Sequence, residues 1–275
     1  MYTDAMIAIA HKELADKLKS RWVIVIALGF AVFTVVIAYF GGATAGVTGF
    51  RRMDATIASL TSLVTYFIPI LALTLGGGII ADERDRGTLD LFLSSPLSVG
   101  EFIAGKFWGL FFALTLSTLA GFGISGILLI TKLGTGTLGS YILFIINSMV
   151  LGVIFLSISF LISVLFYERS RVIAVTVFVW LFFTILYDLG VIGLLVTTKG
   201  EISTGIVSML LMLNPVDIYR TLNFLSIGEF SVVLGLASVE FPSYMRPVLL
   251  WGVSFLWIVL PLVLSYYLFK RRYAS

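Results

Sequence analysis

The 275-residue sequence contains no cysteine and only one histidine, His11. The lack of cysteine excludes disulfides, cysteine-based zinc sites, iron–sulfur clusters and thiol catalysis. A single imidazole also cannot supply a metal centre or a catalytic triad network that needs several histidines. We therefore expect neither a metal site nor a thiol-dependent reaction within one chain.

Charge is scarce as well. Only 12% of the residues are charged, whereas 59% are hydrophobic, and the mean hydropathy is +1.09. A soluble domain with so few charges could not cover its own surface. The net charge of +3 is too small for a nucleic-acid-binding face. The composition thus predicts an integral membrane protein and excludes a soluble enzyme, a disordered tail and a nucleic-acid partner.

Long apolar runs are abundant. A helix needs about 20 apolar residues to cross the hydrocarbon core of a bilayer. Six runs reach this length, and they predict an all-α integral membrane protein with transmembrane helices at about 22–40, 58–80, 103–130, 139–166, 172–197 and 247–269. Small residues at 43–45 could form a signal-peptide cleavage site, but the first run is longer than a signal peptide's apolar core. We expect the first helix to be retained.

Basic residues divide unequally between the two sets of loops. If the N-terminus lies in the cytoplasm, twelve of the 18 Lys and Arg residues fall in cytoplasmic segments and six in outer segments. Cytoplasmic loops of membrane proteins are enriched in Lys and Arg. Both termini are therefore predicted to be cytoplasmic.

Residues 3–20 precede the first span and read as an amphipathic helix on the cytoplasmic membrane surface. The residues of its apolar stripe recur at helical spacing and are Ile7, Ala10, Leu14 and Leu18. A helix with one apolar and one charged face lies in the membrane interface rather than across it. His11, on this helix, is expected to be solvated or interfacial.

The cytoplasmic loop at 82–98 combines both charge signs with an apolar ridge of Leu89, Phe92 and Leu93. Ser98 and Glu101 then form a capping box for the third span. An exposed ridge of this kind suits the groove of another protein. A solvated turn held by helix caps is the alternative, but it does not account for the ridge.

Two other polar segments each leave two interpretations open. The short loop Glu168–Arg171 is either a second cytoplasmic contact or a basic turn. The outer segment 198–246 is interrupted at Asn214-Pro215, and it is either a helix packed on the outer mouth or a re-entrant piece. Its surface is either a docking site for an external partner or a lid.

Polar residues inside the spans are few. Asp188 interrupts the fifth span, and a carboxylate in the membrane should face protein or water. It is a candidate for the transport pathway, with a structural ion pair as the alternative. Asn147, the other pathway candidate, is expected to form an interhelical hydrogen bond.

Three glycine-containing motifs are decoys. Gly100–Phe107 has the glycines and lysine of a phosphate-binding loop, but Phe107 replaces the required hydroxyl and no strand precedes it. Gly134–Gly139 has dinucleotide-binding spacing but lies between two spans. Gly123-Ile124-Ser125-Gly126 resembles the nucleophile motif of rhomboid intramembrane proteases, but no base lies within a span. Close helix packing explains this motif better, and Gly105 and Gly109 fit the same role.

The segment from Ala81 to Pro96, read with the six spans and the N-terminal amphipathic helix, carries a family resemblance. It resembles the first cytoplasmic coupling helix of type-2 ABC exporter permeases, the ABC-2 family, whose fold is termed type V. Within that family the sequence most resembles permeases that serve the assembly of the copper sites of nitrous oxide reductase. The resemblance implies a multi-pass subunit of the cell inner membrane that is not itself an enzyme.

The family resemblance also implies partners. Two copies of the chain are expected over a homodimer of ABC ATPase subunits, which would hold ATP and magnesium, so that this chain binds no cofactor. The residues implied to contact the ATPase are Asp82, Glu83, Arg84, Asp85, Arg86, Gly87, Thr88, Leu89, Phe92, Leu93, Glu168, Arg169 and Arg171.

An external β-helical protein is further implied to dock on the outer segment, and the cargo would be a sulfur species or copper-related. The candidate contacts are Met209, Met212, Asn214, Asp217, Tyr219 and Arg220. Thioethers can bind Cu(I), but Met209 and Met212 have no second ligand type nearby, so packing is the favoured role.

Two other functions remain as alternatives. A secondary carrier would need coupling ions and more intramembrane charge than this sequence has. A membrane scaffold would transmit motion without moving any cargo.

Overall fold

The computed structural model describes residues 2–19, 21–40, 53–89, 97–133, 138–166, 168–227 and 245–273, and over these residues it contains helices and no strand. The helices, in chain order, are α1 (Tyr2–Lys19), α2 (Trp22–Phe40), α3 (Met53–Gly77), α4 (Ala81–Asp85), α6 (Val99–Leu133), α7 (Leu138–Leu165), α8 (Arg169–Leu181), the π-helix η2 (Phe182–Leu186), α9 (Tyr187–Thr197), α10 (Thr204–Met212), α11 (Pro215–Ile227) and α13 (Pro247–Tyr273). The predicted all-α fold is confirmed.

Five helical segments are long and apolar enough to cross a membrane. They are Ala55–Asp85, Val99–Lys132, Leu138–Leu165, Arg169–Thr197 and Pro247–Arg272, and they coincide with five of the six predicted spans. The sixth prediction coincides with the 19-residue helix α2, which forms a further candidate span as a pair with α1, and the two helices are bent by 61° relative to one another. The structure thus has five or six candidate spans, depending on how this bent pair is counted.

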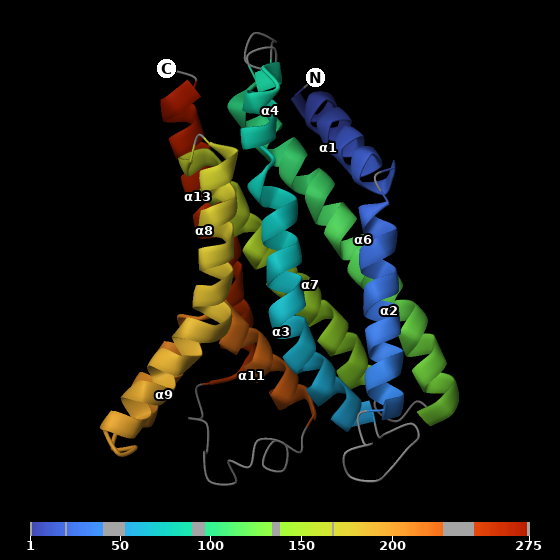
Figure 1. Cartoon of the computed structure of the whole chain (residues 1–275), viewed down its shortest axis with the longest axis vertical. Coiled ribbons are helices and arrows are strands. Elements are labelled where there is room, and N and C mark those ends of the chain that lie inside the picture. Colours follow the sequence, from blue (N-terminus) through green and yellow to red (C-terminus); the bar gives the residue numbers. More distant parts are fainter. Residues whose placement is uncertain are drawn as a thin grey trace.

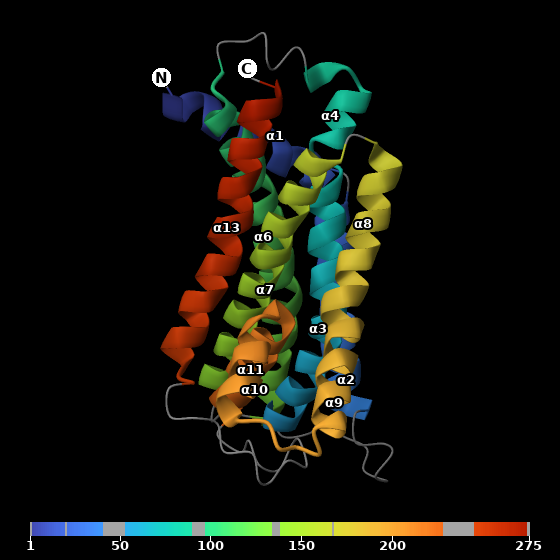
Figure 2. The ribbon, with the colours of Figure 1, turned by 90° about the vertical axis from the view of Figure 1, so that its left-hand side faces the viewer.

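Both chain termini lie at the same end of the helix bundle, beside α4 and the start of α8 (Figure 1). We call this the terminal end and the opposite one the distal end, where α10 lies (Figure 2). The helix α2 runs from the terminal to the distal end, and the five longer segments then cross between the two ends in alternating directions. An even number of passages returns the chain to the end where it began, which agrees with six spans.

The helix α7 forms the centre of the bundle. It packs against α3, α6, α11 and α13. Its buried side chains include Phe144, Phe155 and Phe160. In contrast, α8, α9 and α13 expose most of their side chains, as expected of helices that face lipid or another subunit.

The helix α1 packs along the first third of α6. A Cβ atom on Gly105 would lie 2.8 Å from the Cβ of Ile9, and one on Gly109 would lie 2.6 Å from the Cβ of Glu13. These two glycines therefore allow the backbones to approach closely, as the sequence predicted. The outward face of α1 exposes Ile7 and Leu18, which suits contact with the membrane interface.

We expect Gly109→Ala to destabilise the protein, because the added methyl group would collide with the backbone of α1, where the carbonyl oxygen of Ala10 lies 2.7 Å away. Overpacking of this kind costs about 1–3 kcal/mol. The control is Gly123→Ala on the same helix, where nothing lies within 4 Å of the added atom. Thermal unfolding in detergent, followed by tryptophan fluorescence, measures the melting temperature of each variant. Equal melting temperatures of the two variants would contradict the close packing of α1 on α6.

Candidate functional site

The predicted coupling segment begins where α3 ends. The backbone N–H groups of Ile80 and Ala81 donate to the Ser163 hydroxyl of α7, at 3.1 and 3.4 Å. The short helix α4 follows and ends at Asp85, and Gly87, two residues later, has a φ of 68°, the left-handed conformation that favours glycine. The segment is thus fastened to the central helix before it reaches the surface.

Lys106 joins three helices at the terminal end. Its Nζ atom lies 2.6 Å from the Glu83 carboxylate of α4 and 3.2 Å from the Glu13 carboxylate of α1. The Lys106 side chain is only 5% exposed. A charge buried to this degree is tolerated only when it is paired, so these contacts fix α1 and α4 relative to α6. Thr88 adds a hydroxyl that donates to the Glu83 carboxylate and, at 3.0 Å, to its carbonyl oxygen.

The two predicted cytoplasmic contacts lie side by side. Asp82 of α4 pairs with Arg169 at the start of α8, at 3.3 Å. Arg84 donates to the carbonyl oxygen of Phe166, at 3.3 Å. Arg272 of α13 donates to the last carbonyl oxygens of α7, those of Val164 and Leu165, at 2.8 Å each. The loop before α8 is therefore held by α4 on one side and by α13 on the other.

Part of the predicted apolar ridge is wrong. Leu89 is 3% exposed and belongs to the hydrophobic core, so it cannot enter a partner's groove in this conformation. Phe92 and Leu93 lie outside the described residues. Within the described stretch from Asp82 to Leu89, the exposed residues are Asp85, Arg86 and Gly87, which offer charge rather than apolar area.

The predicted capping box at the start of α6 is confirmed. The Ser98 N–H and hydroxyl groups both donate to the Glu101 carboxylate, at 2.7 Å each, and the Glu101 N–H donates to the Ser98 hydroxyl at 3.2 Å. The reciprocal pair closes the first turn of α6.

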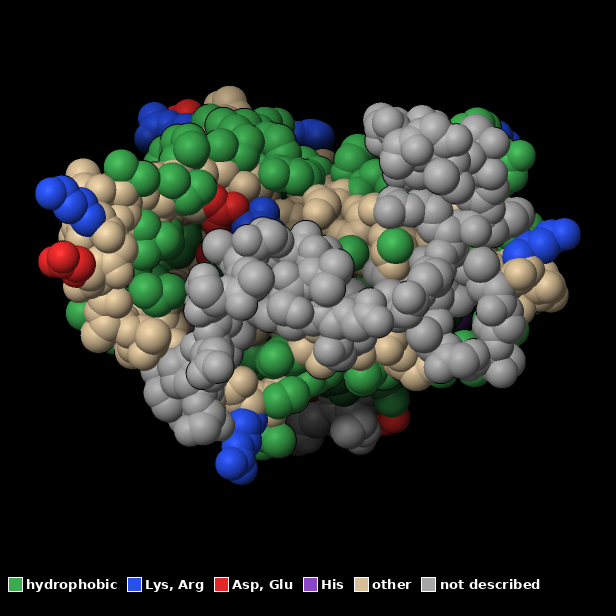
Figure 3. Space-filling model, turned by 90° about the horizontal axis from the view of Figure 1, so that it is seen from below, with side chains coloured by type: hydrophobic (Ala, Val, Ile, Leu, Met, Phe, Trp, Pro, Cys, Tyr) green, Lys and Arg blue, Asp and Glu red, His purple; other side chains and the backbone are tan. Residues whose placement is uncertain are grey.

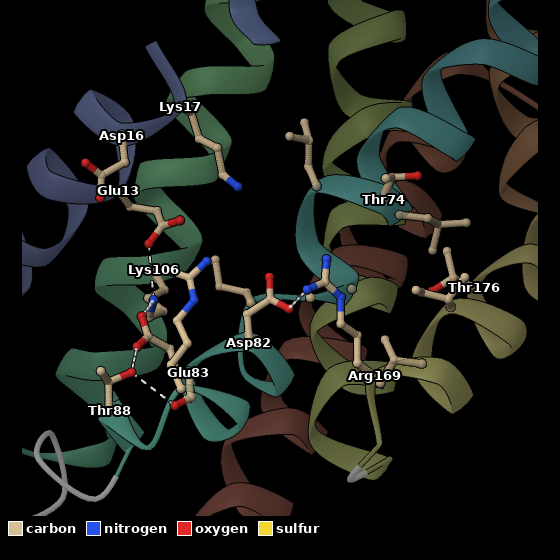
Figure 4. A pocket seen from close by; sticks show the side chains of 18 of the residues that line it. Glu13, Asp16, Lys17, Thr74, Asp82, Glu83, Thr88, Lys106, Arg169 and Thr176 are labelled. Carbon is tan, nitrogen blue, oxygen red and sulfur yellow. Dashed lines mark hydrogen bonds and ion pairs between the residues drawn. The ribbon is translucent and has the colours of Figure 1, made fainter. Parts of the chain in front are cut away.

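A cavity of about 510 Å³ lies beside these ion pairs, between α1, α3, α4, α6 and α8. Figure 4 shows the charged residues of α1, with Glu13, Asp16 and Lys17, on one side of it and Thr74 and Thr176 on the other. The ion pairs of Lys106 and Arg169 border the cavity. The cavity therefore has a charged rim and a less polar interior.

At the distal end, Asn214 joins the outer segment to the fifth span. Its side-chain oxygen accepts from the Val216 N–H at 3.0 Å and so caps α11. Its Nδ2 atom donates to the carbonyl oxygen of Phe183 in the π-helix, at 3.1 Å. A π-helical turn disturbs the regular backbone ladder, and the asparagine supplies a donor at that point.

Asp188 is one of two carboxylates that bind Arg220 of α11. The Nη1 atom of Arg220 donates to the Asp188 carboxylate and, at 3.0 Å, to the Asp217 carboxylate. In the view onto the distal end, an acidic and a basic side chain meet inside the outline of the molecule (Figure 3). Of the two interpretations of Asp188, the structure thus shows the ion pair. The sequence missed this pair because Arg220 was assigned to an outer loop.

Three of the six predicted outer contact residues are not on the surface. Asn214, Asp217 and Tyr219 are buried against the bundle, so they cannot touch an external partner in this conformation. Met209 is exposed, whereas Met212 and Arg220 are partly buried. The reason is that α11 packs against α3, α7 and α13 instead of lying on the outer mouth.

The predicted interhelical bond of Asn147 is confirmed. Its Nδ2 atom donates to Asn223 Oδ1 at 2.9 Å, and Ser148 lies 3.2 Å from the Tyr219 hydroxyl. Both partners belong to α11, which the sequence placed outside the spans. Ser125, the decoy nucleophile, donates to the carbonyl oxygen of its own helix at Gly121, at 2.9 Å, as a structural serine does.

Two kinds of comparison with known proteins agree. The sequence pattern described as "ABC-2 family transporter protein" matches residues 7–273. Two curated relatives are named "Probable ABC transporter permease protein NosY". The one from Pseudomonas aeruginosa is 38% identical over 268 residues, and the one from Stutzerimonas stutzeri is 37% identical over 268 residues. Each alignment covers 96% of this chain and 97% of the relative.

We expect Lys106→Met to destabilise the protein by about 3 kcal/mol, because it leaves the partly buried carboxylates of Glu13 and Glu83 without their buried cation. The control is Arg171→Met, which breaks an exposed pair with Glu168 at 2.9 Å and should change stability little. Denaturant unfolding in detergent measures both. Equal stability of the two variants would show that the Lys106 contacts do not hold the helices together.

Asp217 should make stability depend on pH. It lies on α11, outside the candidate spans, and burial together with the neighbouring Asp188 raises its pKa to about 7. The folded protein therefore binds this proton more tightly than the unfolded chain does. The free energy of unfolding gained from this protonation is lost as the pH rises from about 4 to about 7. Arg220 and Tyr187 are the other titratable groups in this cluster.

The test is the melting temperature of Asp217→Asn relative to the wild type at about pH 5 and about pH 8. The difference should shift in favour of the variant at the higher pH, because asparagine cannot become charged. Asp85→Asn, at an exposed position of α4, is the control and should show no such shift. A parallel pH response of wild type and Asp217→Asn would rule out a raised pKa at Asp217.

Proposed function

The chain belongs to the ABC-2 transporter family and is the permease subunit of an ABC transporter, and we propose that it couples ATP hydrolysis on a separate ATPase subunit to movement across the membrane. The observation that carries this proposal is the ion-pair cluster of Lys106, which ties the exposed segment after α3 to α1 and α6. A push on that segment is thereby delivered to several helices at once.

ATP and magnesium are assigned to the partner, and this chain is a non-catalytic subunit. The segment from Gly100 to Lys106 is part of the helix α6 and not a phosphate-binding loop. Lys106, the residue that would bind phosphate, is engaged with two carboxylates. Both features support ATP hydrolysis on a separate subunit.

The terminal end is assigned to the cytoplasm, in a multi-pass protein of the cell inner membrane. The segments that gather at this end are α1, α4, the start of α8 and the end of α13 (Figures 1 and 2). They carry the larger share of Lys and Arg, including Lys270, Arg271 and Arg272 in the last turn of α13. This charge asymmetry supports cytoplasmic termini.

The contact with the ATPase is assigned to two neighbouring surfaces. One is formed by the exposed residues Asp85, Arg86 and Gly87, and the other by Glu168 and Arg171 at the start of α8. The ion pair between Asp82 and Arg169 joins these surfaces, so that one partner subunit could contact both of them. Movement of this site would shift α3 and α8 between two arrangements, as in other two-state transitions.

A second copy of the chain is assigned to the apolar flank of α8 and α9. Phe178, Phe182 and Leu189 are exposed there. Large exposed side chains along one span suit contact with lipid or with a second subunit. In a homodimer of permeases over a homodimer of ATPases, part of this flank would contact the second permease and the rest would contact lipid.

The cargo system follows from the relatives. Because the two curated relatives are named NosY, we assign the chain to the assembly of the copper sites of nitrous oxide reductase, with a sulfur species or copper-related cargo. An external β-helical partner is assigned to the distal end, where Met209 is exposed on α10. Transport of cargo and transmission of motion to that partner both need the same movement.

The experiment reverses two exposed charges at the C-terminal end of α4 with Asp85→Arg and Arg86→Glu in the intact complex. Co-purification of the ATPase from membranes should fall by about tenfold, because reversed charges oppose docking. The matched control reverses two exposed charges at the distal end with Lys199→Glu and Glu201→Arg, and it should leave the ATPase bound. Undiminished ATPase recovery with the α4 variant that remains folded would contradict the coupling site.

A further inference from the structure

The cavity at the terminal end changes in character with depth. Its rim carries charged residues of α1, α4, α6 and α8, and its interior is lined by Ile70, Leu73 and Val177. Along α3 the lining extends from Gly77 down to Ile70, a rise of seven residue steps, or about 10 Å of helix. A depth of about 10 Å leads from the headgroup region of a bilayer into its hydrocarbon core. The cavity thus suits a molecule with a polar head and an apolar body.

Thr176, at the level between rim and interior, has an unused hydroxyl. The residue is 5% exposed, and its Oγ1 atom has no hydrogen-bond partner. Buried threonines of the two adjoining spans donate to the carbonyl oxygen four residues earlier: Thr61 of α3 to Ile57 at 2.8 Å, and Thr184 of η2 to Trp180 at 2.7 Å. A buried hydroxyl without a partner is costly, and an oxygen atom of a ligand in the cavity would satisfy it.

The rim favours an anionic head. Its carboxylates Glu13 and Glu83 are bound to Lys106, and Asp82 is bound to Arg169. Together with Lys12, Lys17 and Arg86, the cations of the lining outnumber its carboxylates, of which Asp16 is the fourth. In Figure 4, Lys17 points from α1 toward the middle of the cavity.

The interior is continuous with the outer surface of the bundle. Ile173 and Val177 line the cavity and are also 55% and 41% exposed on α8. One turn deeper, the Trp180 indole donates to the carbonyl oxygen of Tyr66 at 3.0 Å, which ties α8 to α3 and closes the gap between them. An acyl chain could therefore enter sideways from the membrane above this closure.

We propose that the cavity binds one anionic phospholipid of the leaflet at the terminal end. The phosphate would lie at the cationic rim near Lys17, a phosphate or ester oxygen would accept from Thr176, and an acyl chain would lie against α3 and α8. Because α1, α4 and α8 all border the cavity, the lipid would hold these elements together. This proposal does not depend on ATPase coupling, since it needs only the chain in a membrane.

The test uses native mass spectrometry of the full-length chain in detergent, titrated with phosphatidylglycerol, phosphatidylcholine or inorganic phosphate. Phosphatidylglycerol should bind with one tightest equivalent, ahead of phosphatidylcholine. Thr176→Val should weaken that equivalent about fivefold through the lost hydrogen bond. Lys17→Gln should weaken it about fivefold, as expected for one cation near an anionic headgroup.

Each variant has a matched control. Thr184→Val removes a buried hydroxyl of the same span that already has its partner, and Lys19→Gln removes an exposed cation of α1 that does not line the cavity. Both should bind phosphatidylglycerol like the wild type. Thr176→Ser, which keeps the hydroxyl, should retain the affinity and show that any loss in Thr176→Val is not caused by misfolding.

Three outcomes would overturn the proposal. Equal binding by Thr176→Val and Thr184→Val would remove the hydroxyl from the site. Equal affinity for phosphatidylcholine and phosphatidylglycerol would remove the anionic head. Displacement of the lipid by inorganic phosphate that binds to the same residues would identify the occupant as a soluble anion.

Discussion

The buried ammonium group of Lys106 is the constraint on which the terminal end depends. In an apolar surrounding its charge must be paired, and the only way to pair it with both Glu13 and Glu83 is to bring α1 and α4 onto α6. Gly105 and Gly109 make this approach sterically possible. Thus a surface helix, a span and the exposed segment after α3 behave as one unit.

The distal end obeys the same rule with different residues. The π-helix in the fifth span and the break before α11 both disturb the backbone ladder at points surrounded by apolar side chains. Asn214 serves both, since it caps α11 and donates to Phe183, while Arg220 pairs with Asp188 and Asp217. Irregular backbone within a membrane protein persists only where such partners are at hand.

Between these two clusters, α3 and α8 are separated at the cavity and joined again at the Trp180–Tyr66 hydrogen bond. The α8 helix continues through η2 into α9, which reaches Arg220 through Asp188. Movement imposed at Arg169 could therefore travel along one continuous span to the distal cluster. A lipid in the cavity would sit beside the upper part of that route, where the two helices have no hydrogen bond between them in the described contacts.

Local patterns in the sequence were enough to predict the all-α fold, the positions of the long apolar helices, the N-terminal helix α1, the Ser98–Glu101 cap and the break at Asn214-Pro215. Each of these depends on residues a few positions apart, whose hydrophobicity or hydrogen bonding acts within one turn or one run. The segment from Ala81 to Pro96 likewise pointed to the ABC-2 family. In contrast, the pairing of Lys106 with Glu13, of Arg220 with Asp188 and of Asn147 with Asn223 joins residues 93, 32 and 76 positions apart. Such partners meet only after the helices have packed. The same packing buries Leu89 and Tyr219, which the sequence alone predicted to be available for contact with a partner.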